Sequence, residues 1–396
     1  MNNVDGVKYC YGCGVCATVC ARDVIEIQLN KDGFYEPVFV KPDACTDCGL
    51  CVDVCSYQDK ELVLSNTTIK SYGAWSKDAI VRKKCSSGGV AYELGRLLLG
   101  KGYKVCAVKY DTKHELALHY IISNEDELED SIGSKYIQSY TVDAFKAIDK
   151  KGKYLVTGTP CQIDSFRRYI RRFKVEENFV LMDFFCHGVP SMLMWKKYLA
   201  EVKARYNNIR RVAWRDKTTG WHDSWSMNIY STNNKLLQTS LFSKGDAFYR
   251  LFLGDGCLGC ACYDRCKFKY KNSSADIRIG DAWGTFYKNN EIGVNAVVTF
   301  TQRGDKLLWA SNLELEELPF ETVAESQMKK PPLRIKEYNE LMTSLRDSEK
   351  PLLDAVRILD KHDTYTKIMY KVDLISHPVK TFRRIFRKII TKIKEQ

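Results

Sequence analysis

The sequence has no apolar run of the roughly 18 to 20 residues that a membrane-spanning helix needs, which excludes a helical integral membrane protein. Its first residues contain neither the basic region nor the apolar stretch of a secretory signal. We therefore expect a cytoplasmic protein whose thiols stay reduced. Sixteen cysteines in such a compartment indicate metal or redox chemistry rather than a disulfide framework.

Eight of the cysteines form two groups with the same spacing, C-x2-C-x2-C-x3-C. The first group is Cys10, Cys13, Cys16 and Cys20, and the second is Cys45, Cys48, Cys51 and Cys55. Three thiols at this spacing can surround one cubane, and in two-cluster ferredoxins the fourth thiol ligates the other cluster. We predict two [4Fe–4S] clusters: cluster I on Cys10, Cys13, Cys16 and Cys55, and cluster II on Cys45, Cys48, Cys51 and Cys20. Zinc favours two separated pairs of ligands, which this spacing does not provide.

The segment between the two groups predicts a β-hairpin. Residues 24–40 alternate between apolar and polar, contain turn residues at 30–33, and then alternate again. The two groups are offset by 35 residues, which indicates an internal duplication. Residues 1–58 thus resemble a bacterial-type two-cluster ferredoxin domain.

Further cysteines predict a third metal centre. After residue 70 the chain mixes strand-like and helix-like runs, which indicates α/β organisation. Cys161 and Cys186 each follow a buried-strand pattern, and loops after such strands form the sites of open α/β sheets. We predict a shared site made by Cys161, Cys186, Cys262 and Cys266. The alternative is a local site, for example for zinc, made by Cys257, Cys260, Cys262 and Cys266.

A short segment rich in serine and glycine precedes an amphipathic helical pattern. It consists of Ser86, Ser87, Gly88 and Gly89. The hydroxyls, the close backbone approach and the helix dipole suit a phosphate or pyrophosphate group. The alternative is an ordinary helix start with glycines for packing.

Six motifs occur in the order SSGG, GSKYIQS, GTPCQI, CHGVPS, CY…CKFK and DIRIGDAWG, and together they resemble the coenzyme F420 hydrogenase/dehydrogenase beta-subunit family. The resemblance implies FAD beside a [4Fe–4S] cluster, with electrons passing from reduced ferredoxin or another donor to coenzyme F420 or an organic substrate. It assigns FAD to Ser86, Ser87, Gly88, Gly89, Gly133, Ser134, Lys135, Tyr136, Gln138, Ser139, Gly158 and Thr159. It assigns the third cluster to Cys161, Cys186, Cys262 and Cys266. The family has CxxC where this chain has an extra residue between Cys262 and Cys266, so Cys257 and Cys260 stay open as alternative ligands.

The resemblance also suggests a mechanism and a substrate class. Flavins exchange electrons singly or in pairs, so we expect the chain to convert single electrons into a two-electron reduction. His187 is the candidate acid–base group and Asp281 a candidate for orienting flavin or substrate, each with a purely structural role as the alternative. The motif forms resemble a bacterial branch found in surface-polysaccharide loci, which favours a small-molecule or lipid-linked glycan substrate over coenzyme F420.

The basic residues are unevenly distributed. The formal net charge of +12 falls to about +6 if three clusters each contribute about −2, and the last seventeen residues hold seven Lys or Arg. We predict no nucleic-acid partner. Apolar residues recur at helical spacing over residues 379–393, opposite a basic face, which predicts either a peripheral membrane helix or a helix docked on its own domain.

Together these patterns predict an α+β protein in three parts. They are a ferredoxin-type domain at residues 1–58, a mixed α/β domain for flavin and cluster at 70–330, and a helical C-terminal region at 331–396. We expect an iron–sulfur flavoenzyme. The competing hypotheses are a coenzyme F420 oxidoreductase or electron-input subunit, and a non-enzymatic iron–sulfur protein, which would bind no flavin.

Overall fold

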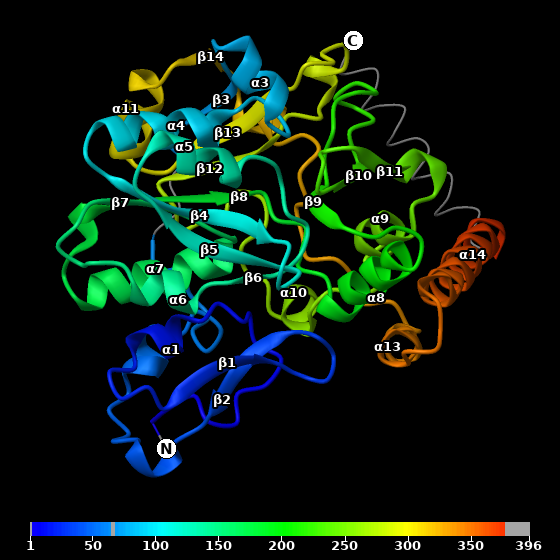
Figure 1. Cartoon of the computed structure of the whole chain (residues 1–396), viewed down its shortest axis with the longest axis horizontal. Helices are drawn as coiled ribbons and strands as arrows, with labels where there is room; N and C mark the ends of the chain where they lie inside the picture. Colours follow the sequence, from blue (N-terminus) through cyan, green and yellow to red (C-terminus); the bar gives the residue numbers. More distant parts are fainter. Residues whose placement is uncertain (1, 65–67, 377–396) are drawn as a thin grey trace.

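The computed structural model describes residues 2–64 and 68–376. They form the predicted α+β structure, with a small N-terminal domain below a large mixed sheet and a helical region at one side (Figure 1). The amphipathic pattern at residues 379–393 lies outside the described residues. In the described part of the chain, no helix is long and apolar enough to cross a membrane.

The N-terminal domain consists of short elements around a hairpin. They are α1 (Val15–Val19), β1 (Ile25–Leu29), β2 (Tyr35–Phe39), the 3-10 helix η1 (Pro42–Ala44) and α2 (Leu50–Asp53). Strands β1 and β2 pair antiparallel up to Leu29 and Tyr35, which places the predicted turn at residues 30–33. Gly33 has a φ of 77° in this turn, and a residue without a side chain adopts that conformation at little cost.

Nine strands form the large sheet, in the order β14-β3-β13-β12-β8-β7-β4-β5-β6. In chain order they are β3 (Lys70–Ser76), β4 (Lys104–Asp111), β5 (Leu116–Ile122), β6 (Ser139–Tyr140), β7 (Tyr154–Thr157), β8 (Phe179–Phe184), β12 (Ile277–Asp281), β13 (Asn295–Thr299) and β14 (Leu313–Glu317). The central strands β12, β8, β7 and β4 are parallel to one another. The loops after β7, β8 and β12 therefore meet at one edge of the sheet, where ligands bind in such folds.

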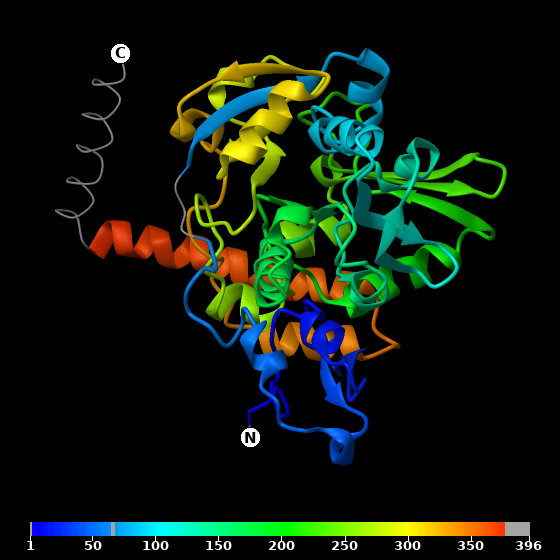
Figure 2. The ribbon, with the colours of Figure 1, turned by 90° about the vertical axis from the view of Figure 1, so that its left-hand side faces the viewer.

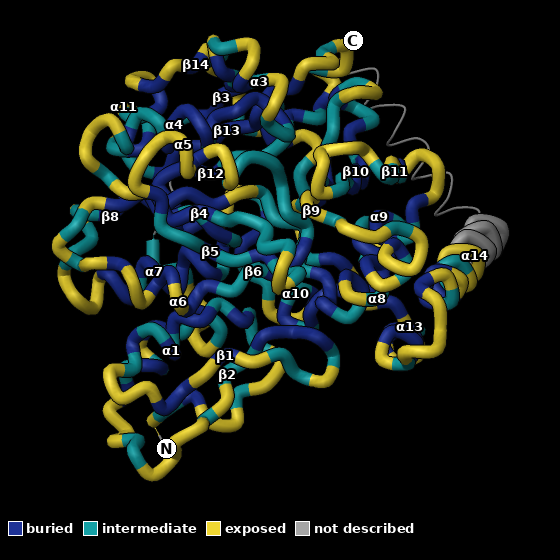
Figure 3. Tube along the Cα trace, viewed as in Figure 1, coloured by how far each residue is buried: buried dark blue, intermediate teal, exposed yellow. Residues whose placement is uncertain are grey.

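Helices cover both faces of this sheet. The helices of this region are α3 (Ala79–Lys84), α4 (Val90–Gly100), α5 (Glu125–Leu128), η2 (Glu129–Ser131), α6 (Val142–Lys146), α7 (Pro160–Arg172), η3 (Glu176–Asn178), η5 (Thr285–Tyr287), α11 (Gln302–Ala310) and α12 (Phe320–Val323). Successive strand residues point to opposite faces, so Leu155 packs with α4 and α11 whereas Val156 packs with α6, α7 and the N-terminal domain. Figure 3 shows the central strands as buried between these layers.

A second layer of structure joins the chain between β8 and β12 to the C-terminal helices. It contains α8 (Met192–Lys203), the three-stranded sheet β9 (Ile209–Ala213), β10 (Ser226–Ser231) and β11 (Leu236–Leu241), η4 (Phe242–Lys244), α9 (Ala247–Leu253), α10 (Cys260–Asp264), α13 (Tyr338–Arg346) and α14 (Leu352–Ser376). Helices α8, α9, α13 and α14 share one apolar core around Trp195 and Phe248. The long α14 runs across the middle of the molecule in Figure 2, above α13.

Candidate redox site

The thiols predicted for cluster I lie together in the N-terminal domain. Burial raises the pKa of the Cys10 thiol to about 12, and the neighbouring thiols of Cys13 and Cys55 act in the same direction. Burial also raises the pKa of Cys16, again with Cys13, Cys10 and Cys55 as charged neighbours. The structure thus places Cys55 beside the first group although it belongs to the second in sequence.

The thiols predicted for cluster II lie nearer the surface. Burial raises the pKa of Cys51, and the thiols of Cys48 and Cys20 act on it as well. Cys48 is exposed, and the side-chain amide of Asn3 lies 3.8 Å from the Cys45 sulfur. The fourth cysteine of the first group therefore lies with the second group.

Four cysteines from distant segments line one pocket of the large domain. They are Cys161, Cys186, Cys262 and Cys266, and Cys10 and Tyr11 reach the same pocket from the N-terminal domain. Cys161 is in the first turn of α7, Cys186 follows β8, and Cys262 lies in α10. Burial raises the pKa of Cys262 to about 12, and Cys186 acts in the same direction.

The two alternative ligands lie elsewhere. Cys257 is fully buried in the apolar core, with its sulfur 3.3 Å from the sulfur of Met194. The sulfur of Cys260 lies 3.9 Å from the hydroxyl of Tyr338. Among the described residues no three His, Cys, Asp or Glu side chains are arranged to hold a single metal ion. Four thiols spread around a pocket suit a cubane, which is larger than one zinc ion.

A cavity of about 480 Å³ adjoins this pocket, a size typical of small-molecule and cofactor sites. Its lining includes most of the residues that the resemblance assigns to FAD, namely Ser86, Ser87, Gly89, Gly133, Ser134, Lys135, Tyr136, Gln138, Ser139, Gly158 and Thr159. Gly88 is outside the lining. A Cβ at Gly88 would lie 2.3 Å from the carbonyl oxygen of Ala74, so this glycine allows the loop to pack against the sheet.

At one end of the cavity the chain presents hydroxyls and a helix start. The Ser86 Oγ accepts a hydrogen bond from the backbone N–H of Ser134 (2.9 Å). Ser87 instead donates to the carbonyl oxygen of Val294 (2.8 Å), so its hydroxyl anchors the loop. The Asn295 side chain accepts from the N–H of Val90 at the start of α4 (3.2 Å). Part of the predicted phosphate cradle is thus engaged within the protein.

Two other predicted cofactor residues make contacts of their own. The Gln138 amide bridges the two domains, donating to the carbonyl oxygens of Gly33 (2.8 Å) and Pro190 (3.1 Å). Burial lowers the pKa of Lys135 to about 7. Its ammonium donates to the carbonyl oxygens of Ser131 and Ile132, which stabilises the loop at this wall of the cavity.

Comparison with known proteins identifies two segments of the chain. Residues 9–58 match the model of the 4Fe-4S dicluster domain. Residues 151–321 match the model of the C terminus of the coenzyme F420 hydrogenase/dehydrogenase beta subunit. Residues 151–321 therefore correspond to the C-terminal part of that beta subunit. The chain is an iron–sulfur electron-transfer oxidoreductase related to these subunits, and we call residues 151–321 the beta-subunit domain.

A solved structure shows a weaker similarity. A chain in the xenon-derivatized F420-reducing [NiFe] hydrogenase complex from Methanosarcina barkeri is 17% identical, with a TM-score of 0.46. The match covers 76% of this chain and 92% of that chain. No curated protein matches the sequence.

The beta-subunit domain contributes an arginine that sequence reasoning missed. Arg215 is 7% exposed, and its guanidinium donates to the Tyr136 hydroxyl (3.1 Å), the Asp281 carboxylate (3.0 Å) and the carbonyl oxygen of Ser86 (3.4 Å). It also lies over the ring of Trp225, 5.0 Å from its centre. Arg215 thus joins three segments of the cavity wall. The string WRDKTTGWHDSW, rich in tryptophan and charge, was the available signal.

The two candidate catalytic residues of the beta-subunit domain both line the cavity. The Nε2 of His187 lies 2.8 Å from the Asp255 carboxylate and 3.1 Å from the carbonyl oxygen of Phe252. Asp281 accepts from Arg215 and from the indole N–H of Trp221 (3.2 Å). Asp281 therefore holds Arg215 in place, in addition to any contact with a ligand.

Proposed function

We propose that this chain is an FAD-dependent iron–sulfur oxidoreductase that receives single electrons at its N-terminal domain and reduces a substrate by two electrons in the cavity. The observation that supports this most strongly is the position of Cys186, which lines both the four-cysteine pocket and the cavity. A third cluster bound through this thiol would lie next to whatever the cavity holds.

The cysteine groups follow one another from the surface to the cavity. The second N-terminal group includes the exposed Cys48, where an external donor such as reduced ferredoxin would approach. Cys10 of the first group lines the pocket of the third group. [4Fe–4S] clusters at these three groups would supply one-electron transfer.

The residues around the cavity fit FAD. Gly133 has a φ of 86° and open space where a Cβ would stand, which leaves room against the backbone. Ser86, Ser134 and the start of α4 supply polar groups for the phosphates, while Val105, Ala107 and Met182 supply an apolar surface for a ring. When bound, FAD supplies the exchange between single electrons and electron pairs.

Residues of this chain then complete the chemistry. The aromatic rings of Tyr136, Trp225 and Phe252 line the cavity and exclude water from the reacting atoms. His187, at the same wall, is our candidate for moving a proton to or from the substrate. Asp281 and the Arg215 that it binds are our candidates for orienting the flavin or substrate.

We propose surface-polysaccharide precursors, including a lipid-linked glycan, as the first substrates to test. The second candidate function is oxidoreduction of coenzyme F420, or electron input to a larger complex, which the description of the matched family favours. Turnover of coenzyme F420 by the isolated chain would select the second candidate.

The deciding experiment is anaerobic purification followed by measurement of iron, sulfide and flavin per chain. We expect about twelve irons and one flavin, because three cubanes would serve one flavin. About eight irons would exclude the third cluster. No flavin after reconstitution would leave an electron-transfer or structural role.

Replacing Arg215 by lysine should weaken flavin retention. Lysine keeps the charge but lacks the planar fork that reaches Ser86, Tyr136 and Asp281 together. If these contacts order the cavity wall only when flavin binds, losing one of them, at about 1.5–3 kcal/mol, corresponds to about tenfold weaker binding or more. Flavin titration of the reconstituted variant measures this. Arg211→Lys on the outer strand β9 is the matched control, and equal flavin affinity in both variants would contradict the role of Arg215.

A further inference from the structure

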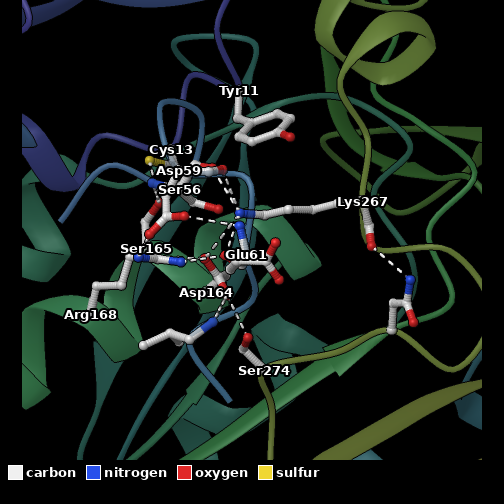
Figure 4. A network of polar contacts seen from close by, with 12 residues as sticks. Tyr11, Cys13, Ser56, Asp59, Glu61, Asp164, Ser165, Arg168, Lys267 and Ser274 are labelled. Atoms are coloured by element: carbon white, nitrogen blue, oxygen red, sulfur yellow. Dashed lines mark hydrogen bonds and ion pairs between the residues drawn. The ribbon is translucent and has the colours of Figure 1, made fainter. Parts of the chain in front are cut away.

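A lysine beside the four-cysteine pocket connects the two domains. The ammonium of Lys267 donates to three backbone carbonyl oxygens, those of Ser56 (3.0 Å), Asp59 (2.9 Å) and Glu61 (2.8 Å). Its side chain is only 15% exposed. In Figure 4 it reaches into the middle of a polar network formed by several other segments of the chain. Three acceptors hold the ammonium in one position.

The residues of this contact are next to predicted cluster ligands in the sequence. Lys267 directly follows Cys266, and Ser56 directly follows Cys55. One side chain therefore ties a ligand loop of the third cysteine group to the segment that leaves the cluster I group. Because a lysine side chain has a fixed maximum length, this tie limits how far the two groups can separate.

Two further side chains make contacts between the same groups. The hydroxyl of Tyr11, the residue after Cys10, donates to the carbonyl oxygen of Arg265, the residue before Cys266. The Ser165 hydroxyl, one turn after Cys161 on α7, lies 3.3 Å from the Cys13 sulfur and accepts a hydrogen bond from the N–H of Ser56 (3.2 Å). Several independent contacts thus link the residues beside the cluster I ligands to the residues beside the ligands of the third group.

The same network places charge near cluster I. Arg168 pairs with Asp164 and Asp59, and Lys267 lies 4.0 Å from the Asp164 carboxylate. Two cations and two carboxylates balance here, so removing Lys267 would leave a net negative charge beside Cys55.

We propose that Lys267 is a positioning residue for electron transfer between cluster I and the third cluster, and that its charge raises the reduction potential of cluster I. The inference rests on the third cluster of the proposed function. Transfer of one electron from cluster I to the third cluster would oxidise the first and reduce the second, and would need no proton or other reactant. A nearby positive charge favours the reduced, more negative state of a cluster.

The test compares variants of the full-length, anaerobically reconstituted protein by redox titration followed with electron paramagnetic resonance. Lys267→Met should shift one N-terminal cluster to a more negative potential and weaken its magnetic coupling to the third cluster. Lys267→Arg should keep the potential near that of the unsubstituted protein. Lys271→Met is the matched control, because Lys271 is an exposed lysine of the same loop, and it should change neither readout.

Tyr11→Phe supplies an independent arm, since it removes only a hydroxyl and keeps the ring. It should weaken the coupling without shifting the potential, because it removes a tie but no charge. If Lys267→Met and Tyr11→Phe both match the unsubstituted protein with about twelve irons bound, the inference is overturned while the proposed function stands. About eight irons in the unsubstituted protein would instead overturn the third cluster itself and, with it, the spacing role of Lys267.

Discussion

Replacing Cys161 by alanine is expected to remove about four of about twelve irons per chain and to abolish reduction of the flavin by an external donor. Cys161 lines the pocket that it shares with Cys186, Cys262 and Cys266. Its loss leaves three thiols, and a cubane that lacks one ligand is accessible to solvent and loses iron more readily. The eight thiols of the N-terminal domain are separate from this pocket except for Cys10, so clusters I and II should remain.

The substitution should leave the fold intact. Cys161 lies in the first turn of α7, but neighbouring residues, and not Cys161 itself, form the cap that starts this helix. Thr159 and Gln162 form a reciprocal capping box, and Pro160 occupies the first turn, where its missing N–H costs nothing. Loss of iron can therefore be assigned to the missing ligand.

Cys260→Ala is the matched control for this prediction, because it removes a thiol from the loop that provides Cys262 and Cys266. Iron analysis and electron paramagnetic resonance of both variants separate the two ligand sets. The shared site requires that only Cys161→Ala lose about four irons. If Cys260→Ala loses metal and Cys161→Ala keeps it, the ligands are the local set instead.

The N-terminal half of this arrangement was predictable because its determinants are local. The cysteine spacing places three thiols of each group within seven residues, and the turn residues at 30–33 specify the hairpin. The same applies to β7, which the apolar string at 154–157 predicts. Once β7 and β8 are parallel neighbours, the residues after them, Cys161 and Cys186, must lie at one edge.

The rest of the site depends on contacts between segments far apart in sequence. Arg215 meets Ser86 across 129 residues and Lys267 meets Ser56 across 211, and no local pattern specifies such partners. The roles within residues 86–89 were equally hidden, because a serine that binds a ligand and a serine that anchors its own loop look alike in sequence. Only the position of Val294 shows that Ser87 is an anchor.

The C-terminal helices show a similar limit. A helical region was predicted at 331–396 as a whole, but apolar helical spacing was identified only over residues 379–393, which lie outside the described residues, and the packing of α13 and α14 was not predicted. Helix α13 and helix α14 share a core with α8 and α9, which lie between the strands of the large domain in sequence. Residues 335–359 thus support the layer that contains Arg215 and Trp225.

Replacing Arg278 by methionine is expected to cost about 3–5 kcal/mol of stability, because it breaks a buried ion pair by removing one partner. Arg278 in β12 is paired in register with Asp183 in β8. Both are 0% exposed, and the guanidinium donates to the two carboxylate oxygens at 2.7 and 2.6 Å. It also donates to the carbonyl oxygens of Phe268 (3.1 Å) and Tyr270 (2.8 Å), which follow Cys266.

The pH dependence of the stability loss distinguishes the broken ion pair from a general disruption of packing. Burial raises the pKa of Asp183, and in the native protein Arg278 opposes that rise. Without Arg278, the pKa of Asp183 in the folded state should rise further above its value in the unfolded state. A raised carboxyl pKa means that the folded state binds more protons, so the stability deficit should grow as pH rises and shrink as pH falls.

Denaturation of the holo-protein at several pH values measures the loss of stability and its dependence on pH. Arg357→Met is the matched control, because its ion pair with Asp354 is 66% and 32% exposed, and such pairs contribute about 1 kcal/mol or less. Replacing Asp183 and Arg278 together by methionine should recover part of the loss, since no unpaired charge remains buried. A deficit in Arg278→Met no larger than in Arg357→Met, or one that grows toward low pH, would mean that the pair is not what secures β12 against β8. The loop after Cys266 would then need another support.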